Sequence, residues 1–414
     1  MSDKNLLEKI ILEKVQKSSE FLKPQWRQYL EFNYTPPYPK HREREIQDIA
    51  LKLIDNVKYR STRNILIHGP PGSGKTMSFK IAHDIAFSIL KNLGEKDFQI
   101  IYVKSGKPIQ TAVEICMKSG VEVPRTGFSV EDYLKTIEKA SKNQYLHICL
   151  DEFDNLLINK THFEKFLYFF TRTENVSATF ITNRLNLAKE IKDIRILSTF
   201  NILNSVQFRP YDKDQVRDIL QERIKMAFVD GSITEEAVDL LSKKIADDGG
   251  DIRKGLSILQ ICGEKALREG VYPITKELMS EYIREYEINA DSKRLEALPL
   301  SDKIILAAIY KCIVVDLSDA VRTDNLFAEQ DYYRKVLGLE GISYDSFTTY
   351  LGRLVAYGVI SMKKQGLGRG RGTMSYVHLR YSQGVIRKLL ENDESLRKIF
   401  EIIYSEIQRR RSKL

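Results

Sequence analysis

The chain has 414 residues, 43% of them hydrophobic, and a formal net charge of +9 at neutral pH. Its length suits two or three domains of about 100–200 residues each, and because it holds no run of about 18 apolar residues, we expect no membrane span. The N-terminus lacks a signal-peptide pattern, and the four cysteines lack the spacing of a metal site or a disulfide framework. We therefore expect a cytoplasmic protein with reduced thiols and no membrane partner.

Residues 1–206 combine a helical lead-in with alternating strands and helices. The five expected strands are short apolar runs: Asn64–His68, Gln99–Val103, Tyr145–Leu150, Ala178–Thr182 and Asn204–Phe208. Helical segments separate them, a pattern that indicates βαβ units and a parallel sheet with helices on both faces. We therefore predict an α/β fold in which residues 1–206 form the base.

The first expected strand runs into Gly69-Pro70-Pro71-Gly72-Ser73-Gly74-Lys75-Thr76, and a helical segment follows. This stretch matches G-x-x-x-x-G-K-[ST], the phosphate-binding loop of nucleoside-triphosphatases. The glycines let successive N–H groups point at phosphate oxygens, and the helix N-terminus adds a partial positive charge. We predict that Gly72, Ser73, Gly74, Lys75 and Thr76 bind ATP or ADP. In that role Lys75 reaches the β and γ phosphates, and the Thr76 hydroxyl is a ligand of Mg²⁺.

Polar residues follow two further strands. The strand Tyr145–Leu150 ends in Asp151 and Glu152. Asp151 is placed to hold the magnesium shell, which is the Walker B role, and Glu152 to orient or deprotonate the attacking water. Asn183 follows the strand Ala178–Thr182, where its amide is placed to contact the γ-phosphate or the water, the role called sensor 1.

Residues 207–290 change to a helical pattern, which predicts a lid over the nucleotide. The expected helices are Asp214–Val229, Thr234–Asp247, Asp251–Glu269 and Thr275–Glu287, with Asp and Thr at the capping positions. Arg253 lies at the start of the third helix, where its guanidinium is suited to fold over the γ-phosphate, the role called sensor 2. Glu152, Asn183 and Arg253 are thus the expected catalytic residues.

The last third of the chain carries most of the excess positive charge. From Asp291 onward there are 21 Lys and Arg against 15 Asp and Glu, which leaves 44 against 41 in the rest of the chain. This balance points to a polyanionic partner. On charge alone, a solvated basic surface without a partner explains the excess of positive charge about as well.

Residues 295–414 have the order of a winged helix. Tyr344–Tyr357 places Phe347, Leu351, Leu354 and Val355 at helical spacing on an apolar face. Its polar face suits a recognition helix in a major groove. Two strands around a Gly-Arg tip follow, and such a tip fits a narrow minor groove. The expected DNA-binding residues are Thr348, Thr349, Arg353, Lys363, Lys364, Arg369 and Arg371.

Several segments resemble one family, the archaeal origin-recognition and replication-initiator AAA+ ATPases, which are related to the eukaryotic origin recognition complex and the cell-division-cycle helicase loader. Tyr34–Glu43 is similar to the family's proline–His-Arg-Glu box, and Val123–Ser129 to its Val-Pro-x-Thr-Gly segment. Pro108–Gly120 lies where the family has a helical insertion that contacts DNA. The resemblance covers roughly residues 33–385. The Walker motifs occur in all AAA+ proteins, but their combination with these segments and a C-terminal winged helix is specific.

The resemblance implies an ATP-binding replication initiator that recognises origin duplex DNA and helps load the replicative helicase, with paralogous initiators as further partners. It places Tyr211 and Arg223 at nucleotide-contacting positions of the lid. Arg195 matches one arginine of the box that carries the intersubunit arginine finger, although a later arginine of eukaryotic relatives is absent. The expected hydrolysis is slow and acts as a switch.

Two other functions remain open at this point. A sequence-specific transcriptional regulator would use the same scaffold with the nucleotide only as a ligand. A remodelling ATPase without sequence preference is the third, but the winged helix argues against it, and its aromatic-glycine pore-loop signature is not evident in the sequence.

Overall fold

The computed structural model describes residues 12, 20–36, 39–184, 204–316, 320–366 and 373–411. They divide into two compact units, Met1–Ser280 and Glu281–Leu414. The expected base and lid therefore share the first unit, and the expected winged helix lies in the second. The boundaries at 206 and 290 stay predictions.

A parallel five-stranded sheet forms the centre of the first unit. Its strands are β1 (Ile65–His68), β2 (Phe98–Lys104), β3 (Tyr145–Asp151), β4 (Val176–Thr182) and β5 (Ser205–Gln207). They are hydrogen-bonded in the order β2-β3-β4-β1-β5, and every pair is parallel. All five strands expected from the sequence are confirmed. The carboxyl ends of β1, β3 and β4 consequently meet at one edge of the sheet.

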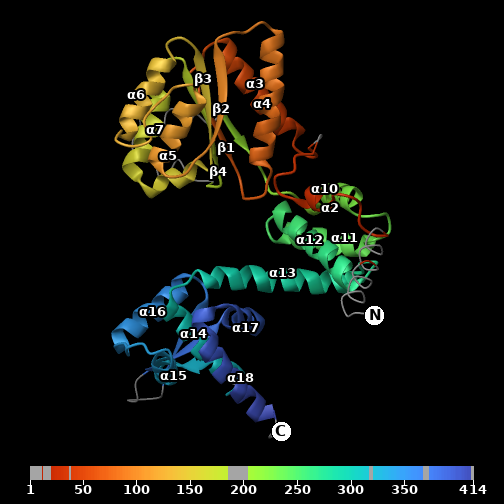
Figure 1. Cartoon of the computed structure of the whole chain (residues 1–414), viewed down its shortest axis with the longest axis vertical. Helices are drawn as coiled ribbons and strands as arrows, with labels where there is room; N and C mark the ends of the chain where they lie inside the picture. The colour runs from red at the N-terminus through yellow and green to blue at the C-terminus, as the bar shows by residue number, and fades with distance from the viewer. Residues whose placement is uncertain are drawn as a thin grey trace. The chain divides into compact units, whose positions relative to one another are not determined.

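Helices cover both faces of this sheet (Figure 1). On one face lie α3 (Glu43–Lys58) and α4 (Lys75–Asn92), which share a core with Ile67 and Ile181. On the other lie α5 (Pro108–Lys118), α6 (Val130–Ala140) and α7 (Lys160–Arg172), packed on Ile148 and Phe180 together with the short 3-10 helix η1 (Phe153–Ile158). Because helices cover both faces, the central strands β3 and β4 are buried at every position.

His147 is the polar exception within β3. It is fully buried, and its two ring nitrogens lie 2.6 Å from the Ser177 hydroxyl and 2.7 Å from the Thr179 hydroxyl, both on neighbouring β4. Tyr145 shares the Ser177 hydroxyl at 2.5 Å. The hydroxyls satisfy both nitrogens of a neutral ring, which explains how a histidine fits inside an apolar sheet.

We predict that His147 makes the first unit less stable in acid. Burial lowers the pKa of His147 from 6.5 to about 3, so between these values the unfolded chain binds a proton that the folded chain excludes. This destabilisation is close to zero well above pH 6.5 and grows as the pH falls. At pH 5 it costs about 2 kcal/mol of unfolding free energy. Urea unfolding at pH 7.5 and pH 5 measures it, and His147→Leu, which cannot titrate, should lose less stability between the two. An equal loss in both proteins would contradict the prediction.

Among the described residues, α10 (Lys213–Ala227), α11 (Glu235–Asp247) and α12 (Ile252–Glu269) form the lid part of the first unit, and α2 (Trp26–Leu30) belongs to the lead-in. Side chains of Thr234 and Asp251 cap α11 and α12 as expected, whereas Asp212, two residues before the expected start at Asp214, caps α10. The described lead-in packs on the lid: the Lys23 amide donates to the Ala227 carbonyl, and the Trp26 ring lies against Gly263. The following α13 (Lys276–Glu296) extends past its expected end at Glu287, because no Gly or Pro interrupts it before Pro299.

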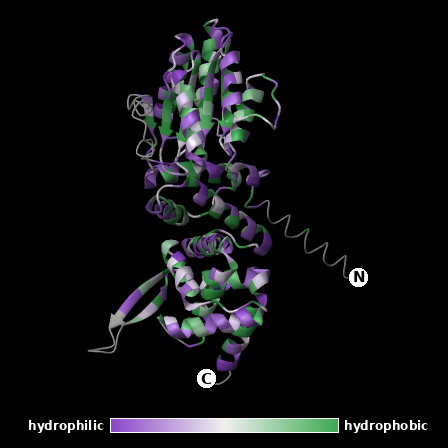
Figure 2. Ribbon diagram, turned by 90° about the vertical axis from the view of Figure 1, so that its left-hand side faces the viewer, coloured by the Kyte–Doolittle hydropathy of each residue, from purple (hydrophilic) through white to green (hydrophobic). Residues whose placement is uncertain are grey.

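The second unit has the winged-helix order. Helices α14 (Leu300–Val314), α15 (Thr323–Val336) and α16 (Tyr344–Ala356) precede the strands β7 (Ile360–Gly366) and β8 (Thr373–Leu379). The two-residue strand β6 (Val321–Arg322) completes a sheet of order β6-β8-β7, and α17 (Gln383–Asn392), η3 (Glu394–Leu396) and α18 (Arg397–Arg411) follow. Figure 2 shows β7 and β8 extending as a hairpin away from the helices of this unit. The expected recognition helix and hairpin strands are thus confirmed as elements.

Two expectations about the whole chain concern membranes and thiols. Among the described residues, no helix combines the length and apolar content needed to cross a bilayer. All four cysteines are buried and unpaired with one another, as the sequence predicted.

Candidate nucleotide site and nucleic-acid interface

The phosphate loop connects β1 to α4 at the carboxyl edge of the sheet. Gly72 and Gly74 adopt φ values of 71° and 91°, the left-handed region that glycine tolerates best. A Cβ at Gly72 would overlap the Asp251 carboxylate, and one at Gly74 would lie 2.7 Å from the Tyr211 hydroxyl. Helix α4 begins at Lys75, so its free N–H groups face the loop. The loop thus has the backbone that phosphate binding requires.

Lys75 lies inside this loop and is only 7% exposed. Its amine donates to the Gly69 and Pro70 carbonyls and, at 2.8 Å, to the Asn183 amide oxygen. Burial lowers the pKa of Lys75 to about 8, although nearby Asp151 opposes the shift. The structure therefore brings Asn183 to Lys75, as their expected roles at one phosphate require.

Asp151 ends β3 beside the first turn of α4. Its Oδ2 accepts hydrogen bonds from the Thr76 hydroxyl at 2.8 Å and the Tyr102 hydroxyl at 2.7 Å, and its Oδ1 accepts from the Glu152 amide at 2.8 Å. A carboxylate and a hydroxyl oxygen side by side are ligands that suit Mg²⁺, which in such sites takes its remaining ligands from phosphates and water. Among the described residues there is no group of three or more His, Cys, Asp or Glu side chains that would hold a metal alone. Thr76 and Asp151 therefore fit the magnesium role only together with a nucleotide.

Glu152 combines a left-handed backbone conformation with a carboxylate that already has two partners. Its φ of 52° lies in the left-handed region, where a residue other than glycine is strained. Its carboxylate pairs with Lys104 at 3.1 Å and accepts a hydrogen bond from the Asn155 amide at 3.2 Å. Acting on water would require Glu152 to exchange these partners.

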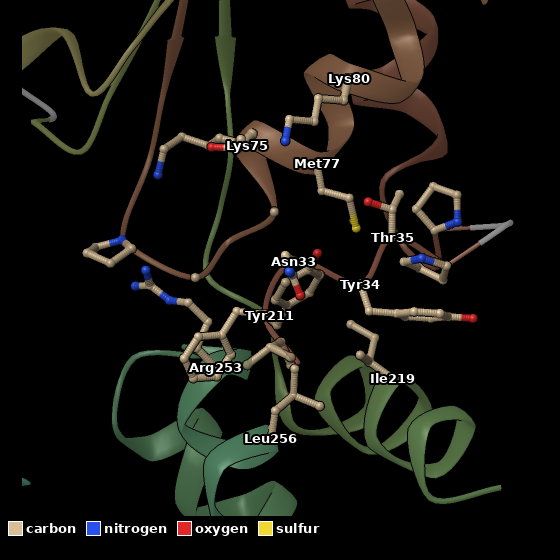
Figure 3. Close-up of a pocket in the computed structure, with 18 of the residues that line it drawn as sticks. Asn33, Tyr34, Thr35, Lys75, Met77, Lys80, Tyr211, Ile219, Arg253 and Leu256 are labelled. Carbon is tan, nitrogen blue, oxygen red and sulfur yellow. The ribbon is translucent and has the colours of Figure 1, made fainter. Parts of the chain in front are cut away.

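The lid contributes Arg253 to the same cavity. Figure 3 shows its side chain extending from α12 toward the phosphate loop. The guanidinium is held by the Asp251 carboxylate through bonds of 2.8 and 2.9 Å, and Asp251 itself caps α12 and touches Gly72. Arg253 is thus near the predicted phosphate position, already oriented by its neighbour.

Tyr211 and Arg223 line the cavity while supporting its walls. Both are buried. The Arg223 guanidinium lies 4.6 Å from the centre of the Tyr34 ring and donates to the Tyr29 and Tyr34 carbonyls. Tyr211 lies beneath Gly74 and stacks under Arg42 at 3.9 Å. Their contact with nucleotide stays a prediction.

Sequence reasoning assigned no role to two residues that shape the site. Arg42, 3% exposed, donates to the Ser73 carbonyl at 2.9 Å and the Arg209 carbonyl at 2.7 Å, and so links the phosphate loop to the segment between β5 and the lid. Tyr102 reaches Asp151 from β2. The proline–His-Arg-Glu box contains Arg42 and was a signal for it, whereas nothing in the sequence around Tyr102 marks its contact.

The cavity between base and lid has a volume of about 250 Å³ and two chemically different ends. The polar end holds the loop together with Asp151, Glu152, Asn183 and Arg253. The other end is formed mainly by the lead-in, α4 and the lid, with Tyr34, Met77, Ile219 and Leu256 labelled in Figure 3. Phosphates at the polar end and a base and sugar at the more apolar end would match this division.

The candidate DNA-binding residues of the second unit are placed differently from one another. Thr348 and Thr349 are exposed on α16, and Lys363 and Lys364 are exposed on β7. Arg369 and Arg371, which follow β7 in the sequence, lie outside the described residues, as does Arg195. The four exposed side chains have the accessibility that DNA contact requires.

The structure gives Arg353 of α16 a protein partner and corrects one expectation about this helix, the burial of Val355. Arg353, predicted among the base-reading side chains, donates to both oxygens of Asp302 at 2.8 and 2.5 Å, and Asp302 is fully buried. The sequence separation of the two residues hid this pair. Val355, predicted on the apolar face, is 40% exposed, because Phe347, Leu351 and Leu354 already fill the turn facing the core. The DNA contact of Arg353 therefore stays a prediction, whereas the structure removes Val355 from the core.

Comparisons with known proteins agree with this arrangement. The chain matches family models for an AAA domain over residues 58–189, a Cdc6 AAA+ ATPase-type lid domain over 217–281 and a CDC6 C-terminal winged helix domain over 293–388. It is 27% identical to an ORC1-type DNA replication protein of Thermococcus kodakarensis, over 92% of this chain and 94% of that protein. It is 28% identical to one of Pyrococcus furiosus, over 92% and 93%. Among solved structures it resembles the Aeropyrum pernix ORC1 protein in complex with DNA, with a TM-score of 0.71 and 26% identity over 90% of this chain and 97% of that one.

Proposed function

From the premise that the chain belongs to the archaeal origin-recognition and replication-initiator family of AAA+ ATPases, we propose that it is an ATP-binding initiator of DNA replication. It recognises origin duplex DNA and helps load the replicative helicase, alongside paralogous initiators. The observation that carries this proposal is the presence, in one chain, of a complete phosphate loop with its Walker B carboxylate and a winged helix with an exposed polar helix face and hairpin.

The nucleotide part of the proposal assigns each residue a distinct task. Lys75 leaves the Asn183 amide and neutralises the β and γ phosphates, while the loop amides hold their oxygens. Thr76 and Asp151 hold the Mg²⁺ that, when bound, neutralises phosphate charge. Glu152 acts on the attacking water once it leaves Lys104 and Asn155, so hydrolysis is slow and serves to end one state of the protein.

The DNA part rests on the second unit and on a relative. The Aeropyrum pernix ORC1 protein has been solved in complex with DNA. We infer that α16 of this chain enters a major groove with Thr348 and Thr349 at base edges, while Lys363 and Lys364 face phosphates. The helix α5, which fills the expected insertion Pro108–Gly120, is a second candidate contact.

Genome-wide occupancy mapping of the full-length protein tests the assignment. An initiator should occupy one or a few sites that coincide with the start of replication. Occupancy of many promoters without replication starts would instead favour the second candidate, an ATP-switched transcriptional regulator that uses the same DNA-binding surface.

We predict that the wing tip contributes affinity without sequence preference. Arg369→Ala with Arg371→Ala should weaken binding to cognate and random duplex alike, because groove potential and phosphates are common to both. The slope of log affinity against log salt should become shallower by about one unit for each phosphate that the variant no longer neutralises. A salt titration with both duplexes measures this. If the double variant keeps the DNA affinity and the salt slope of the unmodified protein, the tip does not contribute to DNA binding.

A further inference from the structure

Tyr102 contacts the Walker B carboxylate from β2, outside the phosphate loop. It lies on β2, where it pairs in register with Cys149 of β3, two residues before Asp151. Its hydroxyl donates to Asp151 Oδ2 at 2.7 Å. The contact therefore crosses from one strand to the end of its neighbour.

The tyrosine ring is fixed by α4, the helix that follows the phosphate loop. The ring centre lies 6.3 Å from that of Phe79, and the Lys80 amine lies 5.2 Å from the ring centre. Phe79 is fully buried. Neither ring contact involves Asp151, so both help to orient the Tyr102 hydroxyl whether or not the carboxylate accepts its hydrogen bond.

Asp151 Oδ2 has two side-chain donors, and only one of them is free to stay when a nucleotide binds. The other is the Thr76 hydroxyl at 2.8 Å, which the proposed function assigns to the metal. Without Tyr102, the Asp151 carboxylate would keep only the Glu152 amide bond to Oδ1, and Oδ2 would be oriented less firmly. Hydrogen bonds behind a metal ligand commonly change metal affinity by about 10–100-fold when they are removed.

We propose that Tyr102 is the positioning residue for magnesium in this site: its hydroxyl orients the Asp151 carboxylate toward the Mg²⁺ of the nucleotide complex. This inference rests on the proposed function, since it requires that the cavity bind a nucleotide with Mg²⁺. It adds a residue of β2, outside the sequence motifs, to the machinery of the site.

The test is the Mg²⁺ dependence of nucleotide binding to the full-length Tyr102→Phe variant, measured by calorimetry with ADP. Phenylalanine keeps the ring and its packing on Phe79 and Lys80 and removes only the donor. We expect a rise of about 10-fold in the Mg²⁺ concentration that produces half of the total change in ADP affinity. ADP affinity in excess chelator should equal that of the unmodified protein, because the chelated state does not use the Asp151 carboxylate as a ligand.

A matched control removes a tyrosine hydroxyl elsewhere in the same unit. Tyr133 donates to the Pro124 carbonyl at 2.7 Å from α6, and Tyr133→Phe should leave the Mg²⁺ dependence unchanged. The inference is overturned if Tyr102→Phe shows the unmodified Mg²⁺ dependence, or if it loses ADP affinity equally with and without Mg²⁺, which indicates a purely structural role. Failure of the unmodified protein to bind ADP at all would instead contradict the proposed function.

Discussion

Lys75→Ala should reduce ATP affinity by at least about 100-fold, the largest effect we expect from a single substitution in the first unit. The amine is the cation inside the phosphate loop, and its hydrogen bonds to charged oxygens contribute roughly 1.5–3 kcal/mol each. Loss of about 3 kcal/mol corresponds to a little over a 100-fold change in Kd. Burial of the amine, which now bonds to two carbonyls and Asn183, means that its desolvation is already complete before phosphate arrives.

Glu152→Gln should instead keep ATP affinity and lose hydrolysis. The amide keeps the size of the side chain and leaves binding nearly unchanged, but it cannot accept a proton from water. A general base typically contributes about 10²–10⁴ in rate, so turnover should fall by at least about 100-fold. Calorimetry with ATP and single-turnover hydrolysis separate the two variants. Lys91→Ala, in the last turn of the same helix as Lys75, is the matched charge control and should change neither quantity.

Unchanged turnover in Glu152→Gln would remove Glu152 from the role of base. Unchanged affinity in Lys75→Ala would mean that the loop amides and Arg253 alone hold the phosphates. Because Lys75→Ala tests ATP binding and Glu152→Gln tests hydrolysis, the result for one variant does not affect the interpretation of the other.

The sequence predicted the sheet and the phosphate loop well because their signals are local. A buried parallel strand is a short apolar run, and the loop needs glycines at fixed offsets followed by Lys75 and Thr76. The bounds of β3 and β4 differ from those expected by at most two residues for this reason. Even His147 follows a rule of alternation: it and Cys149 face the side of the sheet opposite to Ile148.

The residues that were missed depend on contacts between distant segments. Arg42 supports the loop through carbonyl groups at Ser73 and Arg209, and no local pattern shows which carbonyls an arginine will find. Periodicity predicts which side of a helix a residue faces but not its partner. That limit explains why the sequence did not indicate the partner of Arg353, Asp302, which lies on another helix.

The second large effect we expect is a loss of stability in the winged-helix unit when the Arg353–Asp302 pair is broken. Asp302 lies in the first turn of α14 and Arg353 in the last turn of α16, so each charge lies at the helix end that favours it. The guanidinium also lies 4.8 Å from the centre of the Tyr350 ring. Arg353→Ala would leave the fully buried Asp302 without its partner, at a cost on the order of 3 kcal/mol.

Hydrogen exchange of the α14 and α16 amides in the full-length protein measures this cost where it arises. Asp302→Ala should also destabilise the two helices. The double variant should recover much of the stability, because neither charge then remains unpaired. Additive effects in the double variant would show that the two side chains act independently.

DNA binding by the same double variant decides between the two roles of Arg353. If Arg353 positions α16, the variant with restored stability keeps the affinity difference between cognate and random duplex. If Arg353 reads a base, that difference narrows by about 1–3 kcal/mol even though the helices are stable again. We expect the first result, because the Nε and Nη2 groups already bond to a buried carboxylate, which leaves the guanidinium fewer donors for a base. Thr348→Ala and Thr349→Ala disturb no such pair, so any narrowing they produce reports base contact directly.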